Sequence, residues 1–281
     1  MEILSGKELS LKIRQQLKEQ VLKEYINCGK NPPTLAVVLV GNNPASEIYV
    51  RNKERACAEV GLNSKTIKLP ENATMQEIKH TIEQLNEDKS VSGILLQLPL
   101  PNKDMEAEIV ETISPNKDVD ALTLINKGKL ASNLAQIAPC TPCGIIDLLK
   151  ESKTEIAGKN VVVIGRSQLV GRPVATMLTN MDATVTICHS KTKDLKEVCK
   201  DADILIVAIG KPKMINSEYI KDGAVVIDVG INRENGKVVG DVDIETTACM
   251  QGIITPVPGG VGPMTITELI KNTIILAKNQ E

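Results

Sequence analysis

The stretch Val161-Val-Val-Ile-Gly-Arg-Ser-Gln-Leu-Val-Gly-Arg-Pro173 decides how the second half of this chain folds. Its β-branched run predicts a buried strand that breaks at Gly165, and a helix is expected to begin at Gly171. A strand followed by a glycine turn and a helix directs backbone N–H groups and the helix dipole at one point. Because an anionic phosphate is stabilised at such a point, the stretch predicts a nucleotide site.

The glycine spacing alone is a moderate signal. It lacks the middle glycine of the G-x-G-x-x-G fingerprint, and many strand-to-helix turns with two glycines bind nothing. Three further apolar runs follow at 184–188, 204–210 and 224–230, separated by polar, helix-compatible segments. This alternation is typical of a doubly wound parallel sheet with helices on both faces. We therefore expect a Rossmann-type dinucleotide-binding domain over residues 140–263.

The residues that follow the second of these strands favour NADP over NAD. The strand ends in Cys188-His-Ser-Lys191, without the carboxylate that would bind a ribose 2′-hydroxyl. Arg166 lies in the glycine turn, and basic and hydroxyl groups accommodate a 2′-phosphate. The alternative is that Arg166 and Lys191 are ordinary solvated charges.

The composition argues against a nucleic-acid or membrane partner. The 281 residues carry a net charge of −2, contain no long basic or apolar run, and include neither Phe nor Trp. The chain therefore lacks the positive charge that attracts a phosphate backbone and has few aromatic rings on which bases could stack. Seven cysteines, scattered through apolar segments, are typical of reduced thiols in a cytoplasmic protein. Cys140 and Cys143 have the spacing of a metal or redox pair, but without a second pair nearby a structural role is favoured and no metal is expected.

The N-terminal half shows the same alternation of strands and helices. A capping box at Ser5–Glu8 and apolar residues at four-residue spacing predict a first helix of about twenty residues. Apolar runs and capping residues predict the later elements, which are strands at 34–41, 64–69 and 91–98 and helices at 44–60, 74–88 and 141–149. The fold class is therefore α/β in both halves.

The segment Thr255-Pro-Val-Pro-Gly-Gly-Val-Gly-Pro-Met-Thr265 is predicted to be a shaped loop. Its three prolines and three glycines are incompatible with a continuous helix or a central strand. A capping box of Thr265 and Glu268 then predicts a final helix through Ala277. We expect residues 1–139 and the C-terminal helix 264–281 to form one domain and residues 140–263 the other.

Lys53 falls on the apolar face of the helix predicted at 44–60, one turn after Tyr49. Burial lowers the pKa of an amine, which makes it useful for proton transfer near neutral pH, although a lysine at the edge of an apolar stripe more often extends to water. Gln97 within an apolar strand, and Asp118 and Asp120 after a proline-bearing loop, favour the buried interpretation. Together these residues predict a polar pocket in the N-terminal half.

Six motifs lie in order along essentially the whole chain. They are Tyr49-Val-Arg-Asn-Lys53, Gln97-Leu-Pro-Leu-Pro101, Lys117-Asp-Val-Asp120, Pro139-Cys-Thr-Pro142, Gly165-Arg-Ser with Val170-Gly-Arg-Pro173, and the 255–265 loop. Their sequence and order resemble those of the bifunctional methylenetetrahydrofolate dehydrogenase/methenyltetrahydrofolate cyclohydrolase family.

The resemblance implies a two-domain homodimer with a folate cleft between the domains and a last helix that returns to the N-terminal domain. It implies two reactions of one-carbon metabolism, which also serve purine biosynthesis. A hydride passes from the methylene bridge of the folate to NADP⁺, and water then opens the methenyl cation to formyltetrahydrofolate. Tetrahydrofolate derivatives and NADP are the expected ligands.

The resemblance also implies roles for individual residues. Lys53 would be the main catalytic group of the cyclohydrolase step, positioned by Gln97. Tyr49 would stack near the folate, and Asp120 would hydrogen-bond the pterin ring. The cofactor would contact Gly165, Arg166, Ser167, Gly171, Ser190 and Ile231. The folate would contact Tyr49, Asp120, Pro258, Gly259, Gly262 and Pro263.

One departure from the family pattern concerns Ala121, where a glycine is usual. Two other functions stay open at this point. One is an NADP-dependent dehydrogenase that acts on another small substrate with a similar two-domain layout, such as a shikimate-type enzyme. The other is a noncatalytic nucleotide-sensing module, which would need an exposed apolar patch and a filled cleft instead of the lysine, glutamine and aspartate cluster.

Overall fold

The computed structural model describes residues 1–280, apart from the side chain of residue 45. The chain divides into two compact units. Residues Met1–Leu11 and Thr141–Thr265 form the first, and Lys12–Cys140 with residues 266–280 form the second. Residues 1–11 thus lie in a different unit from the one expected, because Glu2 and Ile3 pair with Ile253 and Ile254 as neighbouring parallel strands.

The first unit is built on a six-stranded sheet with the order β1-β11-β8-β7-β5-β6, and every pair in it is parallel. Its strands are β1 (Glu2–Ile3), β5 (Asn160–Ile164), β6 (Thr184–Cys188), β7 (Ile204–Val207), β8 (Val225–Asp228) and β11 (Ile253–Ile254). The predicted doubly wound parallel sheet is confirmed. Strands β7 and β8 end earlier than the apolar runs at 204–210 and 224–230, so the last residues of both runs lie in loops at the carboxyl edge of the sheet.

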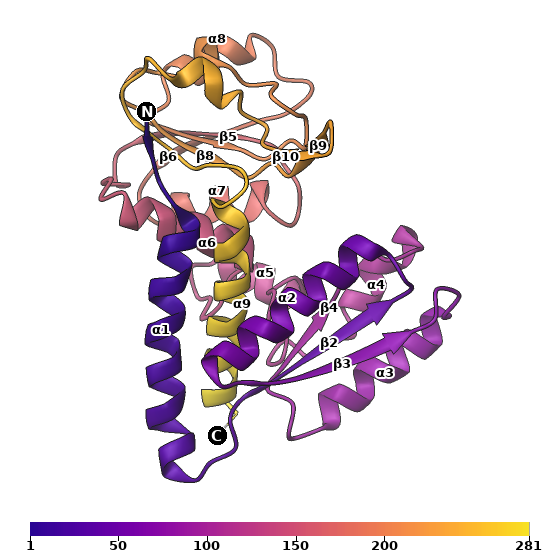
Figure 1. The fold of residues 1–281 in the computed structure, drawn as a ribbon. Coiled ribbons are helices and arrows are strands. Elements are labelled where there is room, and N and C mark those ends of the chain that lie inside the picture. The colour runs from indigo at the N-terminus through magenta and orange to yellow at the C-terminus, as the bar shows by residue number, and fades with distance from the viewer. Residues whose placement is uncertain (281) are drawn as a thin grey trace. The chain divides into compact units, whose positions relative to one another are not determined.

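Helices cover both faces of this sheet, with α8 on the opposite side from α7 (Figure 1). The helices are α6 (Cys140–Glu151), α7 (Gly171–Thr179) and α8 (Leu195–Lys200), with short 3₁₀ turns η3 (Ser217–Tyr219) and η4 (Ile244–Thr247). A separate antiparallel hairpin joins β9 (Asn232–Glu234) to β10 (Lys237–Val239). Asn235 and Gly236 turn the hairpin with φ of +51° and +78°, as a two-residue turn of this kind requires.

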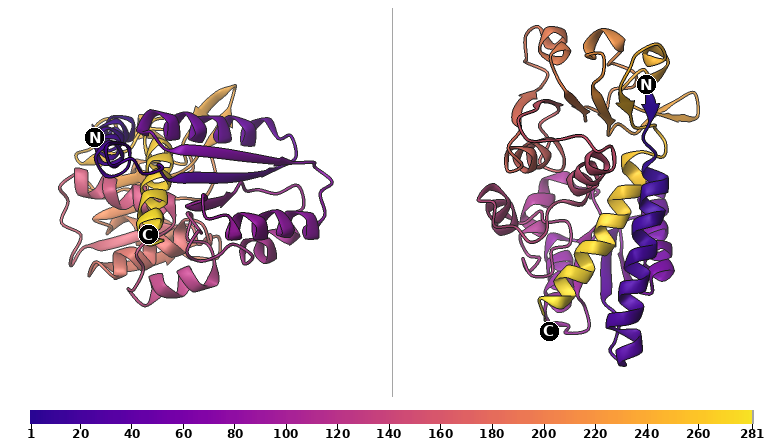
Figure 2. Two further views of the ribbon diagram at one scale, coloured as in Figure 1. Left: turned by 90° about the horizontal axis from the view of Figure 1, so that it is seen from below. Right: turned by 90° about the vertical axis from the view of Figure 1, so that its left-hand side faces the viewer.

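The second unit has a three-stranded parallel sheet with the order β3-β2-β4. The strands are β2 (Thr34–Val40), β3 (Asn63–Leu69) and β4 (Gly93–Leu96), and the helices and 3₁₀ turns are η1 (Ile26–Cys28), α2 (Pro44–Val60), α3 (Met75–Glu87), η2 (Lys103–Met105), α4 (Glu106–Val110) and α5 (Leu124–Ala131). Most of α1 (Gly6–Glu24) and of α9 (Val261–Lys278) also belongs to this unit, whereas residues 6–11 and 261–265 belong to the first. The sheet lies between α2 and α3 (Figure 2).

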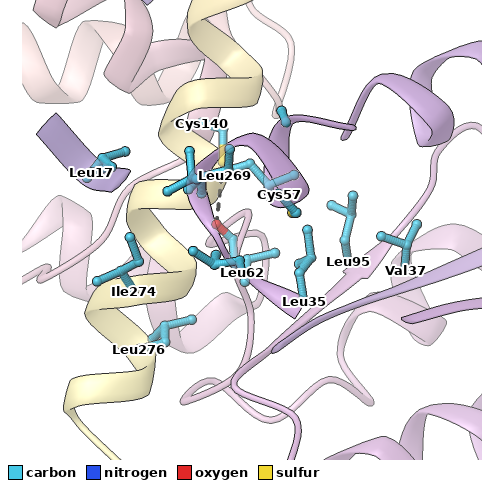
Figure 3. Close-up of a cluster of buried hydrophobic side chains, with 14 of the residues drawn as sticks. Leu17, Leu35, Val37, Cys57, Leu62, Leu95, Cys140, Leu269, Ile274 and Leu276 are labelled. Carbon is cyan, nitrogen blue, oxygen red and sulfur yellow. Dashed lines mark hydrogen bonds between the residues drawn. The ribbon is translucent and has the colours of Figure 1, made fainter. Parts of the chain in front are cut away.

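The two faces of β2 bury different sets of side chains. Leu35, Val37 and Leu39 pack with α2 and with the second half of α9, whereas Ala36, Val38 and Val40 pack with α3. Because successive residues of a strand point to opposite faces, a continuous apolar run is required for a strand covered on both sides. Figure 3 shows Leu35 and Val37 with Cys57 of α2 and with Leu269 and Ile274 of α9.

Two predicted boundaries are wrong. The final helix begins at Val261, four residues before the predicted cap at Thr265, so part of the 255–265 segment is helical. Pro263 is compatible with this start because an N–H in the first turn of a helix has no partner within the helix. The strand predicted at 91–98 extends only over Gly93–Leu96, and Gln97 follows its end. In the described part of the chain, no helix is long and apolar enough to cross a membrane.

Candidate active site

Lys53 and Gln97 meet at the carboxyl edge of the three-stranded sheet. Lys53 is on α2 and Gln97 directly follows β4, and the Lys53 amine donates to the Gln97 Oε1 at 2.9 Å. The backbone N–H of Gln97 donates to the Val38 carbonyl at 2.9 Å, which fixes the residue against β2. The Lys53 side chain is partly buried and points inward, as the sequence predicts.

A second hydrogen bond fixes the orientation of the Gln97 amide. Its Nε2 donates to the Leu98 carbonyl at 2.6 Å. Because a carbonyl oxygen only accepts, the nitrogen of the amide has to face Leu98 and the oxygen has to face Lys53. The amine therefore meets an acceptor that cannot rotate away.

The surroundings of Lys53 favour its neutral form. Burial lowers the pKa of the amine, and the negative charge of Asp120 opposes this effect, followed by smaller contributions from Cys140 and Cys57. Because desolvation outweighs these opposing charges, the pKa of Lys53 lies below its ordinary value. A neutral amine can accept a proton, which an ordinary exposed lysine does not do near pH 7.

The segment that presents Asp120 runs alongside β4. The Ile94 N–H donates to the Lys117 carbonyl at 2.6 Å, and the Val119 N–H donates to the Ile94 carbonyl at 3.5 Å. The partly buried Asp120 follows directly. Its carboxylate is close enough to Lys53 for its charge to act on the amine.

The neighbouring Asp118 has a structural role instead. Its buried carboxylate accepts hydrogen bonds from the Thr123 N–H at 2.8 Å and from the Asn126 side chain at 3.0 Å. These bonds hold the start of α5, so the carboxylate is already engaged. Of the two aspartates that the sequence singled out, only Asp120 belongs to the Lys53 cluster.

Ala121 has a left-handed backbone conformation, with φ of +51°, and its side chain is 1% exposed. A Cβ atom in this region costs about 1–2 kcal/mol. A glycine would avoid that cost, but it would remove a buried methyl group and would increase the conformational entropy of the unfolded chain. Both changes destabilise the fold, and together they cost about as much as the strain that glycine relieves. The departure from the family pattern is therefore close to neutral in energy.

We expect Ala121→Gly to change the free energy of unfolding by less than about 1 kcal/mol. Ala121→Val is expected to lower the free energy of unfolding by about 2–4 kcal/mol, because a β-branched side chain clashes in a left-handed backbone and has no room in the core. Urea unfolding of the two variants measures the difference. Equal effects of glycine and valine would contradict a left-handed conformation at this position.

Tyr49 lies one turn before Lys53 on α2, and the residue is 42% exposed. An exposed aromatic ring beside a buried amine offers a flat apolar surface to a ligand. The structure therefore leaves Tyr49 available for the stacking role that the resemblance implies.

In the first unit, the loop from β5 to α7 has the geometry of a phosphate-binding turn. Gly165 has φ of +128°, and a Cβ atom built there would lie 2.2 Å from the Ala208 carbonyl oxygen. A Cβ atom at Gly171 would lie 2.1 Å from the Gly165 carbonyl oxygen. Both positions therefore require glycine, and the turn brings the start of α7 close to the end of β5.

Ser167 stabilises this turn with its side chain. Its hydroxyl accepts from the Val170 N–H at 3.1 Å and from the Gly171 N–H at 3.4 Å. Arg166 is exposed, and its carbonyl accepts from the Arg172 side chain at 3.3 Å. The hydroxyl of Ser167 therefore shapes the turn as well as being a candidate cofactor contact.

Exposed polar side chains follow β6, the neighbouring strand. Ser190 and Lys191 are exposed in a tight turn that the His189 N–H closes by donating to the Thr192 hydroxyl at 2.9 Å. The Lys191 N–H also donates to the His189 Nδ1 at 3.2 Å. Because β5 and β6 are adjacent and parallel, this turn and the glycine turn lie at the same edge of the sheet. No carboxylate is present among residues 189–191, so this end of β6 suits a 2′-phosphate better than a 2′-hydroxyl.

Two buried aspartates that sequence reasoning missed organise the neighbouring loops of the same edge. The Asp241 carboxylate accepts from the N–H groups of Ile209, Gly210 and Lys211 at 2.7–2.9 Å. It also accepts from the Asn232 side chain at 2.8 Å. Asp241 thereby fixes the loop after β7 to the first residue of β9.

Asp228, at the end of β8, is the second of these carboxylates. It accepts from the N–H groups of Gly230, Asp241 and Val242 at 2.9–3.0 Å. Burial raises its pKa to about 6, Asp241 adds to the increase, and the backbone hydrogen bonds oppose it. The two carboxylates support the loop in which Ile231 is 54% exposed, at the carboxyl edge of the sheet. An aspartate directly at the end of a buried strand was the available sequence signal.

The remaining predicted contacts lie in the 255–263 loop of the first unit. Pro258 is exposed, and Gly259 has φ of +103° with its carbonyl accepting from the Lys7 N–H at 2.8 Å. Gly262 and Pro263 lie in the first turn of α9, where both are partly exposed. The loop is therefore fixed in shape by its neighbours and open at Pro258.

Comparison with known proteins identifies relatives over the whole chain. Family models described as tetrahydrofolate dehydrogenase/cyclohydrolase match residues 4–120 as the catalytic domain and 139–281 as the NAD(P)-binding domain. The chain is 52% identical to the bifunctional protein FolD of Acetivibrio thermocellus, over 99% of this chain and 98% of that protein. The crystal structure of the bifunctional FolD from Campylobacter jejuni is 48% identical, with a TM-score of 0.96 and full coverage of both chains. The dehydrogenase-cyclohydrolase of Trypanosoma brucei, solved with NADP and an inhibitor, is 37% identical with a TM-score of 0.94 over 99% of this chain and 97% of that one.

The two matched ranges contain the two clusters described above. The Lys53, Gln97 and Asp120 cluster lies in the catalytic-domain match, and the Gly165 turn lies in the NAD(P)-binding match. The resemblance found in the six motifs is therefore confirmed. The chain belongs to the tetrahydrofolate dehydrogenase/cyclohydrolase family.

Proposed function

We propose that Lys53, Gln97, Asp120 and Tyr49 form the folate site of a bifunctional enzyme of one-carbon metabolism. The enzyme oxidises 5,10-methylenetetrahydrofolate to the 5,10-methenyl form with NADP⁺ and hydrolyses that product to 10-formyltetrahydrofolate. The observation that carries the proposal is the partly buried Lys53 amine, bonded to Gln97 at 2.9 Å and held below its ordinary pKa by burial. Family membership and 52% identity over nearly the full chain support it.

Lys53 is suited to the hydrolytic step. The methenyl substrate is a cation, so a neutral amine can approach it without repulsion between like charges, whereas a protonated amine cannot. A neutral Lys53 can accept a proton from the water that attacks the methenyl carbon and pass it to the ring nitrogen that leaves as the ring opens. The hydroxyl proton on that carbon is released to solvent as the formyl C=O forms, so that a cation and water give a neutral product and one proton. Gln97 keeps the amine in place, and Asp120 tunes its basicity and accepts hydrogen bonds from the pterin ring.

The turn after β5 fits NADP. Bound NADP⁺ supplies the hydride acceptor, and the task of the protein is to align it. Gly165, Ser167 and Gly171 would hold the diphosphate at the start of α7, where the helix dipole and backbone N–H groups favour an anion. The two glycines permit the tight turn that forms this site, because a Cβ atom at either position would meet a backbone carbonyl oxygen. Arg166 and Ser190 would hold the 2′-phosphate, and Ile231 would contact the cofactor from the loop that Asp228 and Asp241 support.

Other assignments belong to the same proposal. The second unit would bind folate and the first NADP, with Pro258, Gly259, Gly262 and Pro263 as further folate contacts. A homodimer is proposed from family resemblance, and sedimentation equilibrium tests it. A cytoplasmic location is proposed as well. Seven cysteines, none of them in a disulfide within residues 1–280, support it because disulfides persist in oxidising compartments.

A direct assay tests the reaction itself. Purified protein is mixed with 5,10-methylenetetrahydrofolate and NADP⁺, and the methenyl absorbance and NADPH are followed in time. We expect NADPH to accumulate while the methenyl signal rises and then decays to formyltetrahydrofolate. Parallel reactions contain NAD⁺ in place of NADP⁺, or shikimate in place of folate. Failure to reduce NADP⁺ with folate, together with reduction by a non-folate substrate, would reject the proposed function.

A further inference from the structure

Asn272 is a buried amide in the second half of α9, with 3% of its surface exposed. Its surroundings are otherwise aliphatic, since Leu269, Ile270 and Ile274 of the same helix lie in the core of the second unit. A polar group buried in such a place costs about 1–3 kcal/mol unless it is hydrogen-bonded. The partners of this amide therefore indicate what it is for.

Two partners of the Asn272 amide are backbone carbonyl oxygens far away in the sequence. Its Nδ2 donates to the Val119 carbonyl at 2.9 Å and to the Ala138 carbonyl at 3.0 Å. An amide nitrogen has two hydrogens, so both are used. One side chain thus connects the residue before Asp120 with the segment that leads to Cys140.

Cys140 belongs to the same group of contacts. Its thiol donates to the Val119 carbonyl at 3.5 Å, and the Asn272 Nδ2 lies 3.6 Å from its Sγ. Cys140 lies beside Leu269 in the cluster drawn in Figure 3. The Val119 carbonyl is therefore held from two sides by buried donors.

The other supports of Asp120 act on different atoms. The Val119 N–H is directed to Ile94 of β4, and the Val119 side chain packs against Gly93, where an added Cβ atom would lie 2.1 Å from it. On the far side of Asp120 the chain turns at Ala121 with a positive φ. The N–H of Val119 is held by a backbone carbonyl, whereas the carbonyl of Val119 is held by hydrogen bonds from side chains.

We propose that Asn272 is a positioning residue for Asp120, which it holds toward Lys53 by fixing the Val119 carbonyl. The inference rests on the proposed roles of Lys53 and Asp120. The titratable groups whose charge acts on the Lys53 amine are Asp120, Cys140 and Cys57, and the neutral Gln97 is its hydrogen-bond acceptor. Asn272 donates to the carbonyl of Val119, the residue before Asp120, and it also contacts the Cys140 Sγ. It does not contact Lys53.

The direction of the effect follows from the charge of Asp120. A carboxylate near an amine favours the protonated amine and so raises its pKa. If Asp120 moves away, the pKa of Lys53 falls further. The rising limb of the cyclohydrolase pH profile, where Lys53 loses its proton, then moves to lower pH.

The test uses Asn272→Ser, which keeps one shorter donor, and Asn272→Leu, which has a similar volume and no donor. We expect the rising limb of kcat/KM for methenyltetrahydrofolate to shift down by about 0.5 pH unit. The KM for folate should rise about tenfold, because small displacements of a binding group are costly. The KM for NADP⁺ should not change. Thr273→Val is the matched control, since it removes a buried hydroxyl bonded to Leu269 within the same helix and leaves the Val119 carbonyl untouched.

A purely structural role predicts a different result. Asn272→Ser would then lower the melting temperature, while the pH profile and the KM for folate of the folded enzyme stayed those of the parent, and the proposal would be overturned. Failure of both Asn272 variants to fold would also reject it, because the amide would then serve the fold as a whole.

The Asp120→Asn background separates this inference from the proposed function. In that background Asn272→Ser should produce no further shift of the pH profile. If Asp120→Asn itself leaves the profile and the KM for folate unchanged, the proposed role of Asp120 fails. If Asp120→Asn shifts the profile and Asn272→Ser shifts it again by the same amount, the two residues act independently and the positioning role fails.

Discussion

Lys53→Met is expected to lower the rate of methenyltetrahydrofolate hydrolysis about a thousandfold, because the variant has no group to accept the proton of the attacking water. The thioether has a similar length and fits the partly buried site without the cost of desolvating an amine. We therefore expect the variant to fold, with the cost of leaving the Gln97 Oε1 without its donor offset by the relief of that desolvation. NADP⁺ binding, which depends on the first unit, should be unchanged.

The measurement is single-turnover decay of methenyltetrahydrofolate, with NADP⁺ binding and thermal unfolding recorded on the same preparations. Arg55→Met is the control, since Arg55 lies two residues further along α2 with its side chain 74% exposed and only a 3.7 Å contact to Glu59. It should hydrolyse the substrate at the parental rate. Normal cyclohydrolase activity of Lys53→Met would remove this amine from the mechanism.

Gly165→Ala should raise the KM for NADP⁺ more than a hundredfold and lower the free energy of unfolding by about 3 kcal/mol. Gly165 has φ of +128°, and a Cβ atom would lie 2.2 Å from the Ala208 carbonyl oxygen at the end of β7. Because that oxygen belongs to the backbone next to a central strand, it cannot move without disturbing the sheet. The glycine turn would instead be displaced from the start of α7.

Gly158→Ala separates backbone strain from steric contact. Gly158 also has a positive φ, +72°, but nothing lies within 4 Å of a Cβ atom built there. It should cost about 1 kcal/mol, from strain alone, and leave NADP⁺ binding intact. Urea unfolding and steady-state kinetics in NADP⁺ measure both variants. An unchanged KM for NADP⁺ in Gly165→Ala would show that the turn does not contact the cofactor.

Several features of the site could be predicted from local patterns. The helical period placed Lys53 on the apolar side of α2, and its amine is found against Gln97. The apolar run at 161–164 and the glycines at 165 and 171 predicted the strand, the turn and the helix in their order. These predictions succeed because side-chain direction in helices and strands repeats every 3.6 and 2 residues, so the sequence itself records which face is buried.

Other features could not be predicted because local patterns do not mark them. Gln97 was expected inside a strand but follows the end of β4, since hydrogen bonding to β2 decides where a strand stops. The final helix starts at Val261 despite Pro263, because the first turn tolerates a missing N–H. Asp118 and Asp120 are equivalent in the sequence, and only their partners distinguish a capping carboxylate from one near Lys53.

The sequence by itself determined the class of the fold, the glycine turn, the inward lysine and the family. The tertiary structure decided which distant groups meet, such as Asn272 with the carbonyl of Val119, Asp241 with the loop after β7, and residues 2–3 with β11. The physical reason is the distance along the chain over which each kind of interaction acts. Periodicity and turn chemistry act between residues a few positions apart, whereas a buried polar group finds its partners only when segments far apart in the chain have packed together.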